Sequence, residues 1–240
     1  MTPATTAPLT NVGLCLAAMG RAMDRPRHLP GMVTLYGPSG WGKTTAAVYV
    51  ANHTRAYYVQ ATSGWTRKAV LLAVLKAMGI RPAGTIHQMT EQAAEQLALS
   101  GRPLIVDEMD HLVTRNAVEV VRDVYEASGA AVLLIGEEHL PAKLKRWERF
   151  HGRMLDWVPS QPAGMHDAAH LRTLYCRRVV IADDLLARIV ETSRGSVRRI
   201  CVNLARAEAE ALRLGLDAMD LEQWGGRELF TGEAPRRRLA

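Results

Sequence analysis

The residues with the clearest chemical signature form the run Gly37-Pro38-Ser39-Gly40-Trp41-Gly42-Lys43-Thr44. Its three glycines allow the backbone to curl around an anion, because positive φ angles and close approach to a ligand cost glycine little. The N–H groups of such a loop, and of a helix that follows it, point inward and bind phosphate. The spacing predicts a P-loop in which Lys43 reaches the terminal phosphates of a nucleotide and the Thr44 hydroxyl binds Mg²⁺. We expect Thr45 to complete the nucleotide-binding set.

Two carboxylates, Asp107 and Glu108, directly follow the apolar run Leu104-Ile105-Val106. A continuous apolar run of this length indicates a strand buried on both faces of a parallel sheet, and such sheets bind ligands at the carboxyl ends of their strands. Asp107 is expected to hold the Mg²⁺ shell, commonly through water. Glu108 is expected to orient and polarise the attacking water. With the P-loop upstream, this pair predicts hydrolysis of a nucleoside triphosphate.

The elements that must position these residues alternate between β-rich runs and helical patterns. Such alternation predicts an α/β fold with a parallel sheet. The predicted strands are 32–36, 56–60, 102–107, 130–135 and 154–158. The predicted helices are 9–23, 45–51, 66–78, 85–99 and 116–127, with a loop at 109–115 and a cationic helix and turn at 143–153.

A linker containing Pro159, Pro162 and Gly164 follows the last strand, and the pattern after it is purely helical. Helices predicted at 166–177, 182–192 and 197–214 would form a small lid. The predicted organisation is therefore a disordered start at 1–8, a nucleotide-binding α/β domain at 9–160, a helical lid at 165–225 and a basic, disordered tail at 226–240.

Further polar residues lie where they can act on phosphate. Glu137 ends the apolar run 130–135 beside the expected γ-phosphate, where an acid is electrostatically awkward. Either its side chain faces away or another residue takes the sensing task. Arg153, and as second choice Arg149, could reach the γ-phosphate bound by a neighbouring copy of the chain. The alternative for both is an ordinary surface arginine.

Two cations open the helix predicted at 66–78, and both are candidates to contact a DNA backbone. They are Arg67 and Lys68, which follow Trp65 at the helix start. Arg115 is a weaker candidate. The alternative is a half-buried Trp65 with solvated charged neighbours.

Composition indicates an ordinary globular protein, and its net charge would suit a polyanionic partner but is weak evidence for one. The chain has 240 residues, a net charge of +6 and a pI near 9.5, although Arg236, Arg237 and Arg238 alone supply three of the charges. Three widely spaced cysteines predict neither a disulfide framework nor a zinc site. With no apolar run of membrane-spanning length and no leader pattern, we expect a cytoplasmic protein without a membrane partner.

With these elements placed, the chain resembles a small AAA+ ATPase over about residues 9–215. Its Walker A motif is Gly37–Thr44 and its Walker B motif is Leu104–Glu108. Glu137 matches the sensor 1 position, the region 149–153 matches the arginine finger, and Gly195-Ser196-Val197-Arg198 matches the sensor 2 motif, so Arg198 joins the nucleotide-binding candidates. The resemblance implies a five-stranded sheet in the order 5-1-4-3-2, ATP and Mg²⁺ bound between the sheet domain and the lid, and hydrolysis that needs a neighbour's arginine.

Within that family, the segments Asp107-Glu108-Met109-Asp110-His111-Leu112 and Leu134-Ile135-Gly136-Glu137-Glu138-His139-Leu140 resemble MuB-like transposition regulators and the related ExeA-like ATPases. This resemblance implies ATP-dependent polymerisation on double-stranded DNA, with little sequence preference, and delivery of that DNA to a transposase. Head-to-tail contacts that do not close would give a helical filament. The alternatives are a helicase-loader or initiator-like ATPase of replication, an ExeA-like secretion ATPase, and a P-loop kinase for a small molecule.

Overall fold

The computed structural model describes residues 7–234, which divide into two compact units. The α/β unit comprises residues 11–38 and 43–160. The C-terminal unit comprises residues 161–234 with the short segments 7–10 and 39–42. The predicted disorder at 1–8 and in the tail therefore lies outside the described residues, except for Ala7, Pro8 and residues 226–234.

A five-stranded parallel sheet forms the centre of the α/β unit. Its strands are β1 (Met32–Tyr36), β2 (Tyr57–Gln60), β3 (Leu104–Asp107), β4 (Val132–Gly136) and β5 (Met154–Pro159). They lie in the order β2-β3-β4-β1-β5, which is the predicted order 5-1-4-3-2 counted from the other edge, so the predicted fold class is confirmed. Because the strands are parallel, the ends of β1, β3 and β4 meet at one edge of the sheet.

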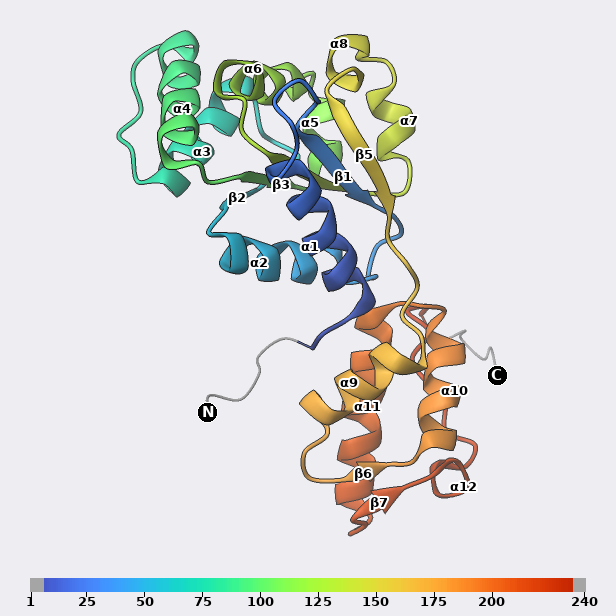
Figure 1. The fold of residues 1–240 in the computed structure, drawn as a ribbon. Coiled ribbons are helices and arrows are strands. Elements are labelled where there is room, and N and C mark those ends of the chain that lie inside the picture. Colours follow the sequence, from blue (N-terminus) through green and yellow to red (C-terminus); the bar gives the residue numbers. More distant parts are fainter. Residues whose placement is uncertain (1–6, 235–240) are drawn as a thin grey trace. The chain divides into compact units, whose positions relative to one another are not determined.

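Eight helices of the described chain surround this sheet (Figure 1). They are α1 (Thr10–Met23), α2 (Lys43–Thr54), α3 (Arg67–Met78), α4 (Ile86–Ser100), α5 (Met109–Thr114), α6 (Val118–Ser128), α7 (Leu140–Leu144) and α8 (Glu148–His151). Across residues 7–234, no helix is both long and apolar enough to cross a bilayer.

The sheet has two buried faces, as the continuous apolar runs predicted. Met32, Leu104 and Val132 belong to one large apolar cluster together with residues of α3, α4 and α6. The residues next to them along the strands, such as Val33 and Leu133, are also fully buried and point to the opposite face, because side chains alternate along a strand. Figure 1 shows α1 and α2 on that second face.

Local signals mark the ends of α3 and α4. Gly79 ends α3 in the left-handed conformation at φ 74°, and the side chains of Thr66 and Thr85 cap α3 and α4 by accepting backbone N–H bonds. The loop predicted at 109–115 is wrong, since it forms α5. Met109 and Leu112 are both fully buried, and their spacing of three residues is that of a helix packed on the core.

The C-terminal unit consists mainly of α9 (Met165–Tyr175), α10 (Asp183–Ser193), α11 (Val197–Arg213) and the short α12 (Leu221–Trp224). It also contains two short parallel strands, β6 (Val180–Ile181) and β7 (Ala218–Met219), which the sequence reading did not predict. Ile181 and Met219 are fully buried, so these two paired strands add to the apolar core of the helical unit.

Residues 226–234 differ from the predicted disordered tail, because they pack on α11. The side chain of Asn203, fully buried, accepts a hydrogen bond from Phe230 N at 2.7 Å and donates one to Phe230 O at 3.1 Å. The Arg206 guanidinium lies 5.1 Å from the Phe230 ring centre. A buried amide is stable only when hydrogen-bonded, so this pairing explains why the segment is ordered.

The two neighbouring leucines on α3 give a matched test of this core. Leu71 is fully buried in the apolar cluster and Leu72 is 39% exposed. We expect Leu71→Ala to lower the free energy of unfolding by about 2–5 kcal/mol, because it leaves a cavity, and Leu72→Ala by less than about 1 kcal/mol. Urea unfolding at constant m-value measures both. Equal losses would contradict the packing described for α3.

Candidate nucleotide-binding site

The predicted P-loop joins the end of β1 to the start of α2. Gly37, Gly40 and Gly42 have φ angles of 155°, 84° and 83°, which residues with a Cβ rarely adopt. A Cβ on Gly37 would also lie 2.0 Å from the Ser160 Oγ, so any larger residue there would force this hydroxyl to move. The loop therefore has the curled backbone that the glycine spacing predicted, and its role as an anion cradle stays a prediction.

Lys43 lies at the first position of α2, and its ammonium group is turned back onto the loop. The Nζ donates hydrogen bonds to Gly37 O at 2.7 Å and Pro38 O at 2.8 Å. Burial lowers the pKa of Lys43, and this effect outweighs the opposing influence of nearby carboxylates, of which Glu108 and Asp107 are the strongest. The structure therefore brings Lys43 close to the predicted catalytic carboxylates.

Asp107 is 1% exposed, and both of its carboxylate oxygens accept hydrogen bonds. The Oδ1 accepts from Glu108 N at 2.8 Å, and the Oδ2 accepts from the Tyr58 hydroxyl at 2.9 Å. Burial, followed by the charge of Asp107, raises the pKa of Tyr58, so the hydroxyl keeps its proton and remains a donor. Tyr58 orients a predicted Mg²⁺ ligand, and sequence reasoning missed it.

Glu108 is the residue with the most unusual backbone in the site. Its φ of 55° and ψ of 40° place it in the left-handed region, just before α5 begins. Non-glycine residues held in this region concentrate at functional sites. Burial and the neighbouring Asp107 raise the pKa of the Glu108 carboxyl, which makes it a stronger proton acceptor than an exposed glutamate.

Glu137 follows β4 and lies in a small charged cluster with Asp110 and Lys143. Asp110 is 6% exposed; its Oδ2 accepts from Glu137 N at 2.6 Å and its Oδ1 from Lys143 Nζ at 2.6 Å. The Lys143 ammonium is also 3.7 Å from the Glu137 carboxylate. A lysine thus offsets the acid at the predicted sensor 1 position, and neither Asp110 nor Lys143 had been assigned this role.

The arginine-finger candidates lie near the amino-terminal end of a strand, whereas the P-loop follows the carboxyl-terminal end of β1. Arg153 immediately precedes β5, is 43% exposed and forms an ion pair with Glu126. Arg149 is exposed on α8, four residues earlier. Because β5 runs parallel to β1, the start of β5 and the P-loop are at opposite ends of the strands. The proposed role of either arginine toward the nucleotide of another copy stays a prediction.

Arg198 lies in the first turn of α11 and is exposed. It belongs to the C-terminal unit, so its role toward nucleotide stays a prediction. Ser196 caps this helix, and its hydroxyl accepts a hydrogen bond from Arg199 N at 3.3 Å.

The three DNA-contact candidates, Arg67, Lys68 and Arg115, line one surface pocket. The Arg115 Nε donates to Ser63 O at 2.8 Å, and the Arg67 Nε donates to Asn116 O at 3.2 Å. The structure thus joins the start of α3 to the turn after α5 and collects three exposed cations from two distant parts of the sequence.

The residues at the carboxyl edge of the sheet fit a nucleotide with Mg²⁺. The loop provides N–H donors and Lys43, and Thr44 and Asp107 provide oxygen ligands of the kind Mg²⁺ prefers. The Oγ of Ser160, buried against Gly37, has no hydrogen-bond partner within residues 7–234. Bound Mg²⁺ would neutralise charge on the phosphate oxygens.

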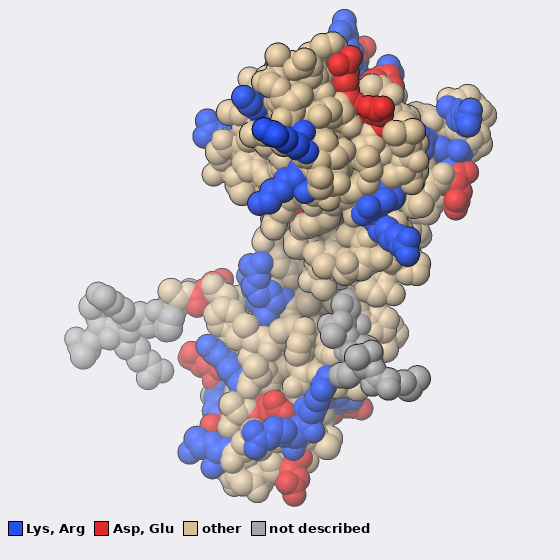
Figure 2. Space-filling view, turned by 90° about the vertical axis from the view of Figure 1, so that its left-hand side faces the viewer, with Lys and Arg blue, Asp and Glu red and all other residues tan. Residues whose placement is uncertain are grey.

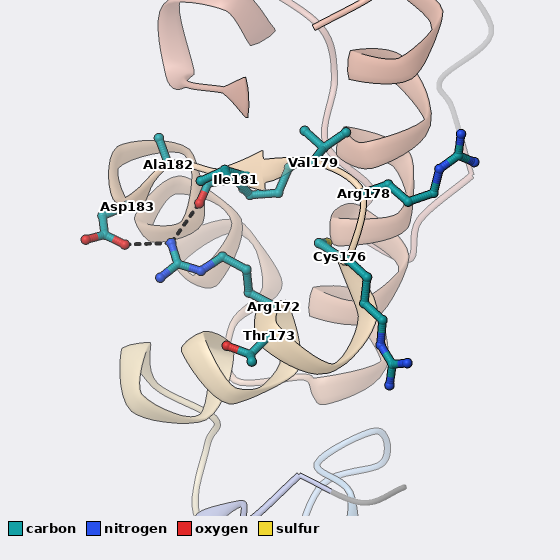
Figure 3. A pocket seen from close by; sticks show the side chains of 10 residues that line it. Arg172, Thr173, Cys176, Arg178, Val179, Ile181, Ala182 and Asp183 are labelled. Carbon is teal, nitrogen blue, oxygen red and sulfur yellow. Dashed lines mark hydrogen bonds and ion pairs between the residues drawn. The ribbon is translucent and has the colours of Figure 1, made fainter. Parts of the chain in front are cut away.

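Another pocket, in the C-terminal unit, lies beside β6 and the end of α9 (Figure 3). There the Arg172 guanidinium is held by Ile181 O at 2.7 Å and Asp183 Oδ1 at 2.6 Å, and Arg178 points away from the cavity. None of the predicted nucleotide-binding residues lines it.

Comparison with known proteins agrees with the fold. Residues 27–144 match the AAA domain family. No curated protein matches the chain. Similar solved structures are Cdc6p from Pyrobaculum aerophilum (16% identity, TM-score 0.64, covering 91% of this chain and 66% of that one), Orc1 from Aeropyrum pernix in complex with DNA (18%, 0.65, 89% and 62%) and the RuvB Holliday junction branch migration motor from Thermotoga maritima (18%, 0.61, 90% and 67%).

The sheet order and the similar structures therefore define a P-loop fold of the AAA+ type. The match of residues 27–144 to the AAA domain family supports an AAA+ ATPase. The chain spans about two thirds of the length of the solved structures named above, and identities of 16 to 18% extend the likeness to the fold alone.

The hydrogen bond from Tyr58 to Asp107 predicts a selective effect on Mg²⁺. Tyr58→Phe removes the donor and leaves the ring, so we expect about tenfold more Mg²⁺ to be needed for half-maximal ATP turnover. The adjacent Tyr57→Phe is the control, because the Tyr57 hydroxyl accepts from Gln96 Nε2 instead. A Mg²⁺ titration of turnover compares the two variants, and identical midpoints would exclude a role for Tyr58 in positioning Asp107.

Proposed function

We propose that this AAA+ ATPase assembles with ATP on double-stranded DNA, largely without sequence preference, and delivers that DNA to a transposase. The observation that carries the DNA-binding part is the pocket where Arg67, Lys68 and Arg115 converge on one face of an ATPase domain. Their exposed guanidinium and ammonium groups suit backbone phosphates, which carry no sequence information.

The distribution of charge on the α/β unit supports a polyanionic partner. Figure 2 shows Lys and Arg side chains in several groups across one face of this unit, whereas the visible Asp and Glu lie mainly toward its upper edge. Arg67 and Lys68 occupy the first turn of α3, which contains no acidic residue. Cations there oppose the helix dipole, so a bound phosphate would be stabilised by both.

Self-association is supported by the position of the arginine candidates. Arg149 and Arg153 lie just before β5, and the P-loop follows the opposite end of the parallel neighbouring strand β1. A neighbouring copy would have to supply the arginine for each nucleotide, and repetition of one such heterologous contact produces a ring or a filament. The terminal phosphate of ATP would then stabilise the contact between copies.

A helicase-loader or initiator-like ATPase of replication remains the second candidate. Among the similar solved structures are Cdc6p and Orc1, the latter with DNA. Co-purification of a replicative helicase, rather than a transposase encoded beside this gene, would favour that function. The ExeA-like and small-molecule kinase alternatives lack a comparable observation. Phosphate transfer to an acceptor other than water would identify the kinase.

Electron microscopy of the protein with long duplex DNA tests the proposal. With ATP or a slowly hydrolysed analogue at low ionic strength, we expect filaments or stacked rings that cover the DNA, and with ADP we expect sparse binding. The affinity should fall steeply with salt, because each neutralised phosphate contributes about −0.9 to the slope of log K against log salt. A protein that stays monomeric and unbound under all these conditions would overturn the proposal.

A mixing experiment tests which arginine acts between copies. Lys43→Ala keeps its arginines but cannot use ATP, whereas Arg149→Ala and Arg153→Ala keep an intact P-loop. Each variant alone is expected to lose ATP turnover if its residue is essential. A mixture of Lys43→Ala with the correct arginine variant should regain about a quarter or more of wild-type turnover, because mixed contacts join a working P-loop to a working arginine. No recovery with either variant would argue against action between copies.

A further inference from the structure

A second basic pocket lies between α5 and the segment of α7 and α8. Its walls include Thr114 and Asn116 on one side and His139, Lys143, Arg146 and Trp147 on the other, around a cavity of about 690 Å³. That volume is within the range of ordinary ligand sites. The pocket belongs entirely to the α/β unit.

The chemistry of this pocket suits a nucleic-acid backbone. No Asp or Glu is among the described residues that line it. Arg146 is exposed, and within residues 7–234 its guanidinium makes no hydrogen bond or ion pair. The half-buried Trp147 beside it offers an apolar wall of the kind that sugars and bases contact next to a cation.

The pocket adjoins the three proposed DNA contacts. Asn116 lines it, and its carbonyl accepts the hydrogen bond from Arg67, which lines the first pocket. Arg115, the preceding residue, faces the first pocket and is fixed to Ser63 O. The turn at 115–116 thus separates two basic pockets, and one phosphate backbone can pass along both.

The second pocket is also joined to the ATP site by direct contacts. α5 begins immediately after Glu108 and ends at Thr114 in the pocket wall. Lys143, on the opposite wall, donates to Asp110, and the other oxygen of that carboxylate holds Glu137 N. One lysine therefore faces the pocket and also fixes the acid at the sensor 1 position.

We propose that the pocket between α5 and α7 binds a backbone phosphate of double-stranded DNA and thereby couples DNA to ATP turnover. A phosphate there competes with Asp110 and Glu137 for the Lys143 ammonium and frees Glu137 to move relative to Glu108. The proposal rests on the proposed function, since it takes DNA binding as given. It adds Arg146 and Lys143 to the DNA-binding surface and assigns the coupling to one lysine.

Arg146→Ala and its neighbour Lys145→Ala provide a matched test. Both residues are exposed and carry one positive charge, but Lys145 does not line the pocket. The affinity for long duplex DNA is measured with ATP at a series of salt concentrations. The Arg146 variant should lose about five- to tenfold in affinity near 0.1 M salt, and the slope of log K against log salt should become shallower by about one. The Lys145 variant should match the wild type. Thermal unfolding verifies that both variants are folded.

The coupling is measured as the ratio of ATP turnover with saturating DNA to turnover without it. Lys143→Met removes the ammonium group, and we expect this ratio to fall toward one even where DNA binding saturates. Lys145→Met should keep the wild-type ratio. An unchanged ratio in a folded Lys143 variant would overturn the coupling.

The outcomes separate this inference from the proposed function. One outcome would reject only the second pocket: the wild type binds DNA, Arg67→Ala weakens this binding, and Arg146→Ala binds DNA as well as Lys145→Ala does. The second pocket would then not be a DNA site, and the proposed function would stand. If the wild type shows no salt-dependent DNA binding with ATP, both proposals are wrong.

Discussion

The structure depends on a charge balance at the carboxyl edge of the sheet. Four carboxylates gather there around two lysines: Asp107, Glu108, Asp110 and Glu137 around Lys43 and Lys143. When ionised, the acids exceed the ammonium groups by two charges. Like charges in a partly buried region repel one another, and the proposed Mg²⁺ would offset this excess.

This balance also explains why the polar groups are held so firmly. Asp107, at the end of β3, and Asp110, at the start of α5, each accept two hydrogen bonds through separate oxygens. Their positions are therefore fixed before any ligand arrives, which reduces the reorganisation that binding requires. Glu108, held in the left-handed region between them, is aimed by the backbone rather than by its own side-chain contacts.

The fold was accessible from sequence because its signals are local. Apolar runs marked the strands, helical patterns marked most of the helices, and the glycines of the P-loop marked the turn between β1 and α2. The sheet order came from the family resemblance, since no local pattern states which strands are neighbours. α5 was missed because six residues with two buried apolar positions resemble a loop as much as a helix.

The parts of the site that sequence did not reveal are contacts between distant segments. Tyr58 meets Asp107 only because β2 pairs with β3. Lys143 meets Asp110 only because α7 packs beside α5, and in sequence it was one cation of a basic cluster. The short strands β6 and β7 were hidden for the same reason, since two residues have no periodicity to detect.

The two hydrogen bonds between the Asn203 side chain and the Phe230 backbone extend the folded part of the C-terminal unit beyond its last helix, α12. A chain shortened before Phe230 would leave a buried amide with an unpaired donor and an unpaired acceptor, at about 1–3 kcal/mol of destabilisation for each. Peptide fusions or protease sites introduced between α12 and Phe230 would meet the same penalty if they break these hydrogen bonds.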